Sequence, residues 1–408
     1  MKAYERFMKY AAFPTMSCED SQTCPSTEKQ LVLAKCLKDE LLALGLSDAR
    51  VDENGYVYAT LEKNCEEDVN SIGFIAHMDT ASEASDENIK LQMVQYTGGD
   101  ILLNKEKDIY LKVSDYPYLS DYVGHNIITS DGTTLIGADD KAGIAEIMTA
   151  LEKIITKNLK HGKISIGFTP DEEIGRGADL FDVDGFGADY AYTVDGGAIG
   201  ELEYENFNAA SAKVTVNGVS IHPGSAKNKM KNASVIAYEF NSLLPQDEVP
   251  EKTSGYEGFH HLISISSKTE LANLVYIIRD HDKEKFEQKK NGFEKAAEVL
   301  NEKYGAGTVE VLIKDSYYNM KEKIEPCMYI VDRAKAAMQD VGITPVVVPI
   351  RGGTDGARLS FMGLPCPNLC AGGENYHSRF EFVSIEAMEK ISDIIVKIVE
   401  NAVYEGKK

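Results

Sequence analysis

Residues 71–80, SIGFIAHMDT, predict the strand around which the rest of the fold is organised. A mostly apolar run leads into His77, and Asp79 follows two positions later. Such a run is typical of a buried strand that delivers polar side chains to the edge of a sheet, where open α/β sheets carry out chemistry. Because residues two apart on a strand face the same way, we expect Asp79 to hold the imidazole of His77.

The same arrangement recurs along the chain, where apolar segments end in an acidic residue. Asp139 follows residues 135–138, Glu172 and Glu173 follow the strand-like residues 163–169, and Asp195 follows residues 190–194. Each position alone has a plainer interpretation, such as a charge at a helix N-terminus, a solvated loop or a turn. Together with His77, and with His377 in a later loop, they predict a metal centre at one edge of the sheet.

Charge arithmetic favours a pair of zinc ions in this centre. Two Zn²⁺ ions carry +4, the carboxylates of Asp139, Glu173 and Asp195 offset −3, and a bridging hydroxide brings the site near neutrality. One residue must bridge the ions, and Asp139 is the choice because a carboxylate binds with both oxygens. Glu172 adjoins a ligand but is itself unassigned, so we expect it to be the general base for a shared water.

Composition excludes several classes of protein. The chain has 408 residues, of which 43% are hydrophobic and 26% charged, as in a soluble globular protein of two domains. The net charge of −22 argues against nucleic-acid and anionic-membrane partners. The N-terminus resembles neither a signal peptide nor an anchor, and no stretch is long enough to span a bilayer. Seven scattered cysteines predict reduced thiols and a cytoplasmic location.

The pattern of elements predicts an α/β domain with a central mixed sheet flanked by helices. Helices are expected at residues 4–12, 27–44, 144–155, 326–340 and 384–403. Asn54 and Gly55 predict a hairpin within 51–60, and further strands are expected at 71–76, 163–169, 190–194, 346–350 and 368–371. Residues 82–129 are interpreted as an insertion with its own β structure, and residues 351–356 as a glycine-rich turn.

A second domain is predicted within the first. Strands at 212–216, 262–266, 274–278 and 308–313, with helices at 233–244 and 283–304, give the β-α-β-β-α-β order of a ferredoxin-like domain. The predicted organisation is therefore a catalytic domain made of residues 1–207 and 317–408, interrupted by a lid domain of residues 208–316.

Seven motifs identify the chain as similar to one family. They are HMDT (77–80), GADDKAG (137–143), TPDEEIG (169–175), VDGG (194–197), HPGSAKNKM (222–230), RGGTDGARLS (351–360) and GGENYHS (372–378). They resemble the co-catalytic zinc peptidases, which also include carboxypeptidase and aminoacylase relatives. The resemblance implies a zinc-peptidase catalytic domain with a lid, two Zn²⁺ per subunit, and removal of the N-terminal residue from tripeptides.

The resemblance also implies roles for individual residues. The zinc ligands are expected to be His77, Asp139, Glu173, Asp195 and His377, with Asp139 bridging, Glu172 as general base and Asp79 steering His77. It implies that His222, otherwise interpreted as a structural or solvated loop residue, stabilises the oxyanion. Arg279 and Arg351 are candidates for binding a peptide carboxylate or carbonyl, and surface ion pairing is the rival interpretation for both. Of the two, Arg351 is preferred because it lies in a glycine-rich loop at a strand end.

Alternatives remain within and outside this family. A dipeptidase, a carboxypeptidase or an N-acyl amino-acid hydrolase on the same scaffold shares the zinc chemistry. An acidic calcium-binding or scaffold protein is the alternative from another class, but FDVDGFG (181–187) lacks the acidic residues a calcium loop requires. The expected partner is a small peptide substrate, and a homodimer is a candidate assembly because lid-bearing relatives are often dimers.

Overall fold

The computed structural model describes residues 1–408, which form two compact units. The larger unit contains Met1–Tyr204, Glu322–Val348 and Thr354–Lys408, and the smaller contains Glu205–Lys321 with Pro349–Gly353. The lid domain predicted at residues 208–316 begins three residues after the first segment of the smaller unit begins and ends five residues before that segment ends. It did not anticipate that residues 349–353 belong with the smaller unit.

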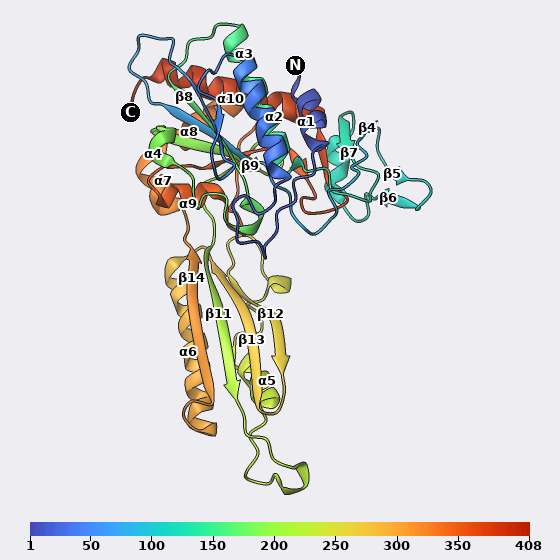
Figure 1. Ribbon diagram of the computed structural model, residues 1–408, viewed down its shortest axis with the longest axis vertical. Coiled ribbons are helices and arrows are strands. Elements are labelled where there is room, and N and C mark those ends of the chain that lie inside the picture. The colour runs from blue at the N-terminus through green and yellow to red at the C-terminus, as the bar shows by residue number, and fades with distance from the viewer. The chain divides into compact units, whose positions relative to one another are not determined.

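An eight-stranded mixed sheet forms the centre of the larger unit, and it confirms the predicted α/β class (Figure 1). β3 pairs in parallel with β8 and β9, whereas β2 is antiparallel to β8 and β10 is antiparallel to β16. The strands, in spatial order, are β1 (Arg50–Val51), β2 (Val57–Leu61), β8 (Ile164–Thr169), β3 (Ile72–His77), β9 (Tyr190–Gly196), β16 (Asn368–Cys370), β10 (Glu201–Glu203) and β15 (Val346–Val347).

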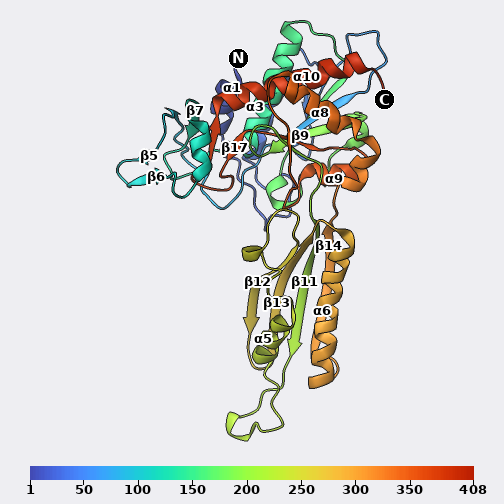
Figure 2. The ribbon, with the colours of Figure 1, turned by 180° about the vertical axis from the view of Figure 1, so that it is seen from behind.

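Helices cover the central sheet and explain why β3 is buried along its whole length. α3 (Ala138–Thr156) contacts β3 and β9, and α1 (Ala3–Ala11) and α10 (Ile385–Glu405) pack beside α3 (Figures 1 and 2). α2 (Gln30–Ala43), α4 (Val183–Phe186) and α9 (Asp355–Phe361) contact β2, β8 and β9 respectively, and α8 (Tyr329–Asp340) contacts α10. Ile75 of β3 belongs to an apolar cluster with Phe181, Phe186 and Leu359.

Two smaller sheets correct the interpretation of residues 82–129 as a self-contained insertion. β5 (Ile101–Asn104) and β6 (Ile109–Leu111) pair only with each other. β4 (Gln92–Gln95) and β7 (Asn126–Thr129), however, share a four-stranded sheet with β17 (Gly373–Glu374) and β18 (Phe382–Ser384). Half of the insertion is therefore completed by the chain around His377.

The smaller unit has the predicted element order and an antiparallel sheet in the order β12-β13-β11-β14. Its elements are β11 (Asn208–Asn217), α5 (Ala233–Leu243), β12 (Phe259–Ser267), β13 (Leu271–Asp280), α6 (Lys283–Tyr304) and β14 (Val309–Tyr317). One sheet face packs Val214, Leu274 and Tyr276 against Phe240 of α5 and Phe293 of α6. That core accounts for the alternating pattern in the sequence.

Three predicted elements near the C-terminus differ in extent from the structure. The strand expected at 346–350 is only β15, and the turn expected at 351–356 gives way to α9, which Thr354 caps by accepting a hydrogen bond from the Gly356 N–H. The helix expected at 326–340 is α8, which begins at Tyr329 and ends at Asp340; a 3₁₀ turn at Glu325–Cys327 and a short helix, α7 (Lys321–Ile324), precede it. Pro326 lies in that turn, where a missing N–H is tolerated.

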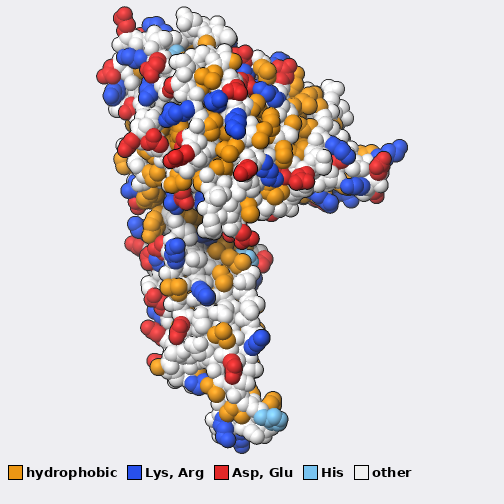
Figure 3. Space-filling model, in the orientation of Figure 1, with side chains coloured by type: hydrophobic (Ala, Val, Ile, Leu, Met, Phe, Trp, Pro, Cys, Tyr) orange, Lys and Arg blue, Asp and Glu red, His pale blue; other side chains and the backbone are white.

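Charge is distributed over the surface. Acidic and basic side chains are interspersed on the face shown in Figure 3. None of the helices combines the length and the apolar character needed to cross a membrane.

Candidate active site

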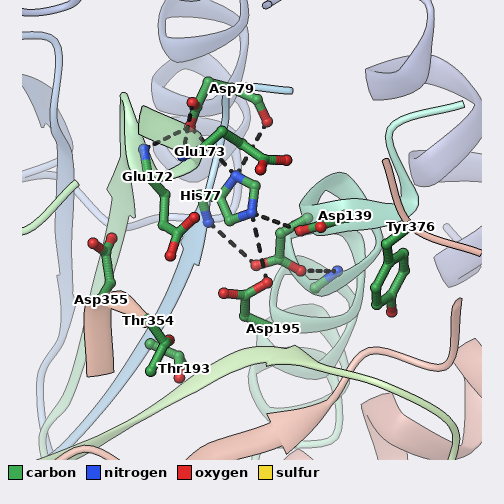
Figure 4. A network of polar contacts seen from close by, with 12 residues as sticks. His77, Asp79, Asp139, Glu172, Glu173, Thr193, Asp195, Thr354, Asp355 and Tyr376 are labelled. Carbon is green, nitrogen blue, oxygen red and sulfur yellow. Dashed lines mark hydrogen bonds and ion pairs between the residues drawn. The ribbon is translucent and has the colours of Figure 1, made fainter. Parts of the chain in front are cut away.

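His77 lies at the carboxyl end of β3 and is buried, as the sequence predicted for the edge of the sheet. Its Nδ1 is 3.4 Å from the Oδ1 atom of Asp79 and 3.1 Å from the Asp79 carbonyl oxygen. Its Nε2 is 2.7 Å from Oδ1 of Asp139 (Figure 4). Asp79 therefore faces one nitrogen of the imidazole and leaves the other directed at the acidic group.

Asp139 stands at the start of α3 and directs its two carboxylate oxygens at two different histidines. Oδ1 faces His77, whereas Oδ2 is 3.2 Å from Nε2 of His377. The backbone N–H groups of Ile136, Gly137 and Asp139 all donate to the buried carboxylate of Glu381 at 2.8–3.1 Å. Glu381 thereby fixes the chain that carries Asp139, a role that the sequence analysis missed.

Each histidine has a second carboxylate beside it. Oδ1 of Asp195 is 3.5 Å from Nε2 of His77, and Oε2 of Glu173 is 2.9 Å from Nε2 of His377. The other oxygen of Glu173, Oε1, is buried without a hydrogen-bond donor. The structure thus brings the five predicted ligands into two overlapping groups that share Asp139.

Asp140 also lies close to His77 and Asp195, with possible ligand atoms of all three within 4.8 Å of one another. Its oxygens, however, accept hydrogen bonds from the backbone N–H groups of His77 and Gly143, both at 3.2 Å. Asp140 is therefore occupied in holding the strand end to the helix start, which agrees with its omission from the predicted ligands.

The electrostatics of this group suit divalent cations. Burial, together with the nearby Asp139, raises the pKa of Glu173 to about 7, and burial raises the pKa of Asp195 to about 6 against the effect of His77. Hydrogen bonds with Asp139 and Glu173 raise the pKa of His377 to about 11. Crowded carboxylates, two imidazoles and the unpaired Oε1 of Glu173 form a donor set that fits a pair of zinc-like ions.

Glu172 follows β8 in a 3₁₀ turn at Glu172–Ile174, and its carboxylate has no hydrogen bond or ion pair within the chain. Burial and the nearby Asp195 raise its pKa well above the ordinary value, and Asp355 adds to this effect. Figure 4 shows the side chain directed away from Asp79, towards the space beside Asp355 and Asp195. A carboxylate that is positioned but unpaired has the properties of a proton acceptor.

Asp79 and Asp355 are two further buried carboxylates near Glu172. The carboxylate of Asp79 accepts the backbone N–H groups of Glu172 at 3.0 Å and Glu173 at 3.2 Å, so it orients the loop as well as His77. Asp355, at the start of α9, is buried and accepts the hydroxyl of Thr169 at 2.8 Å. The sequence analysis missed Asp355 although it lies within the RGGTDG motif, because that motif was interpreted as a turn.

The three predicted substrate-binding residues belong to the smaller unit. His222 is exposed in the loop after β11, and its Nδ1 accepts the Gly224 N–H. Arg351 donates to the carbonyls of residues 255 and 257 and to the Thr253 hydroxyl, and it stacks on Phe207 and Phe259. Arg279 lies over the Tyr317 ring, and its Nη1 is buried without an acceptor.

These contacts reverse the order of preference between the two arginines. The guanidinium of Arg351 is already used to hold a loop, whereas Arg279 retains an unpaired donor. A buried N–H without an acceptor is costly, so Arg279, rather than Arg351, has a donor available for an acceptor outside the chain.

Comparison with known proteins agrees with this geometry. Residues 129–401 match the model of peptidase family M20/M25/M40. The chain belongs to this family and is a peptidase, which confirms the resemblance inferred from the motifs. Its relatives include Peptidase T of Clostridium novyi (strain NT), which is 58% identical over 397 residues that cover 97% of this chain and 98% of that protein.

Solved structures share the fold over almost the whole chain. The aminopeptidase PepT from Bacillus cereus superposes with a TM-score of 0.78 at 24% identity, covering 98% of both chains. A tripeptidase from Staphylococcus aureus gives a TM-score of 0.78 at 22% identity, covering 99% of this chain and 98% of the other. At these identities the two structures support the fold alone.

Proposed function

We propose that the chain is an aminopeptidase that removes the first residue of tripeptides with the help of two zinc ions. The observation that carries the proposal is the carboxylate of Asp139, whose oxygens face His77 and His377 separately. His77 and Asp195 would hold one ion together with Asp139, and His377 and Glu173 would hold the other, also together with Asp139. When bound, the ions would polarise the peptide carbonyl and make a water molecule more acidic.

Glu172 would act as the general base and then as the general acid. Its unpaired carboxylate would take a proton from the attacking water and return it to the nitrogen of the departing amine. Asp79 holds the backbone of Glu172, so the carboxylate starts from a fixed position. A raised pKa suits this role, because the group must give up the proton as readily as it takes it.

The smaller unit supplies the candidates for holding the rest of the substrate. Arg279 has a free donor for the carboxylate of a short peptide, and His222 would stabilise the oxyanion through its free Nε2. The proposal includes a cytoplasmic location, which the seven free cysteines support, and a homodimer as a candidate assembly.

A panel of modified peptides tests the direction of cleavage. Free tripeptides should release their first residue, N-acetylated tripeptides should be cleaved little, and C-amidated ones should keep partial activity, because acetylation removes the amino-terminal charge. Release of the C-terminal residue first would indicate a carboxypeptidase, preferred hydrolysis of the N-acetylated series an acylase, and preference for two residues a dipeptidase. Metal analysis of the purified protein should find about two zinc ions per chain.

A further inference from the structure

The loop that carries Glu172 and Glu173 begins at Asp171, whose backbone has a left-handed conformation. Its φ is 60° and its ψ is 25°, values that are uncommon for residues other than glycine, although aspartate is among those that tolerate them best. Asp171 is only 1% exposed. Its carboxylate is therefore shielded from water and needs hydrogen-bond donors from the chain itself.

Two side chains from the N-terminal part of the chain hold Asp171. Oδ2 accepts the Ser26 N–H at 2.7 Å, and Oδ1 accepts both the Ser26 hydroxyl and the Gln30 Nε2–H, the latter at 2.8 Å. In return, Oε1 of Gln30 accepts the backbone N–H of Asp171 at 3.3 Å. Gln30 is fully buried and Ser26 is 7% exposed, so water offers no easy substitute for these bonds.

The same N-terminal segment, residues 16–30, contacts the neighbouring loops. The Ser17 N–H donates to the carbonyl of Thr80, next to Asp79, at 3.2 Å. The Arg176 guanidinium donates to the carbonyls of Ser21 and Cys18 at 3.0 and 3.3 Å. We call residues 16–30 the N-terminal bracket, because they hold Asp171, the residue that precedes Glu172 and Glu173 in what we call the base loop, residues 171–174.

We propose that Gln30 and Ser26 are positioning residues for peptide hydrolysis, acting through Asp171 on Glu172 and Glu173. Asp79 holds the backbone N–H groups of the two glutamates, and the bracket holds the residue before them. The backbone is therefore held at three consecutive residues, Asp171, Glu172 and Glu173, and this fixes the direction in which the Glu172 side chain leaves the loop. This inference rests on the proposed role of Glu172 as the base. A displacement of about 1 Å at a reacting group can cost about 10²-fold in rate.

The substitution Gln30→Leu tests the bracket, since it keeps the size of the side chain but removes both hydrogen bonds to Asp171. We expect kcat to fall about tenfold with KM little changed, and zinc affinity to fall about tenfold, because Glu173 shares the loop. Ser26→Ala removes one hydroxyl and should give a smaller loss in the same direction. Gln22→Leu is the matched control, because Gln22 lies in the same segment but is exposed.

Combining the change with Glu172→Gln separates positioning from general support of the fold. With zinc saturating, so that the effect through Glu173 is removed, the Glu172→Gln background has no base left to aim, and Gln30→Leu should lower kcat less than threefold. A full tenfold loss in both backgrounds, or no loss in Gln30→Leu alone, would overturn the inference. If Glu172→Gln itself kept a normal kcat, the proposed role of Glu172 would fail instead.

A second variant keeps the test decisive if Gln30→Leu does not fold. Asp171→Asn tolerates the positive φ and keeps the size of the side chain, but it has only one acceptor oxygen, so it cannot satisfy the donors of both Ser26 and Gln30. It should therefore remain folded, judged by its thermal midpoint, and still lose about tenfold in kcat and in zinc affinity. Wild-type values for both would show that the bracket does not position the base.

Discussion

Replacing Asp79 with Asn keeps the size of the side chain and tests its two contacts, one with His77 and one with the backbone of Glu172 and Glu173. In the structure, Oδ1 accepts the Glu172 N–H and Oδ2 accepts the Glu173 N–H, and the residue is completely buried. An asparagine has only one acceptor oxygen, so its NH₂ group must face one of these two donors. One buried N–H left unpaired costs about 1–3 kcal/mol, which corresponds to about 5- to 150-fold in the population of the correctly held loop.

We therefore expect Asp79→Asn to lower kcat and zinc affinity by about 10- to 100-fold each, the range found for partners of metal-bound histidines. The assay is steady-state cleavage of a free tripeptide, together with zinc content after dialysis against graded chelator. Asp39→Asn on α2 is the matched control, because that side chain is 70% exposed. If Asp79→Asn kept wild-type kcat and zinc content, Asp79 would hold neither His77 nor the base loop in any way that matters for activity.

Three further predictions address the metal centre and the core. His377→Ala should lose zinc and activity together, because one ion is left with too few ligands; metal analysis showing full zinc and normal turnover would remove His377 from the site. Zinc binding to metal-free protein should release protons at neutral pH, because His377, whose pKa is raised to about 11, must bind as a neutral imidazole. The release should increase below about pH 6–7, since Glu173 and Asp195 have pKa values raised to about 7 and about 6 and bind as carboxylates, so affinity should fall as the pH falls. Calorimetry in two buffers of different ionisation enthalpy measures this release, and equal heats would contradict it. Glu146 is buried with both oxygens unpaired and its pKa is raised by burial, so the stability of the wild type should fall as the pH rises above about 4.5 through the raised value. Glu146→Met lacks this loss, so urea unfolding should show its advantage growing from pH 5 to pH 8, and a pH-independent difference would refute the reasoning.

Local sequence was enough to predict the site residues that lie at the ends of strands. The apolar run before His77 is a strand buried along its whole length, and the spacing to Asp79 places that carboxylate beside the imidazole. Such features depend on the period of a strand and on where it ends, which neighbouring residues reveal. The order of elements in the smaller unit was predictable for the same reason.

Contacts between distant segments were not predictable in this way. Glu381 receives three N–H groups at the start of α3 from 242–245 positions away, and Gln30 holds Asp171 across 141 positions. Nothing in the neighbourhood of Glu381 or Gln30 distinguishes them from other polar residues. The start of α9 was missed because Gly352 and Gly353 favour a turn locally, whereas the buried position of Asp355 and the Thr354 cap decide for a helix.

The wide spacing of the ligands along the chain has a consequence during synthesis. His77 leaves the ribosome early, whereas His377 lies close to the end of the 408-residue chain. At about 5–20 residues per second, roughly 15–60 s separate the two. During that interval the nascent chain already contains His77, Asp139, Glu173 and Asp195 but not His377. On the proposed ligand set, a chain that ends before His377 lacks a ligand of one ion, so truncated chains are expected to have no peptidase activity.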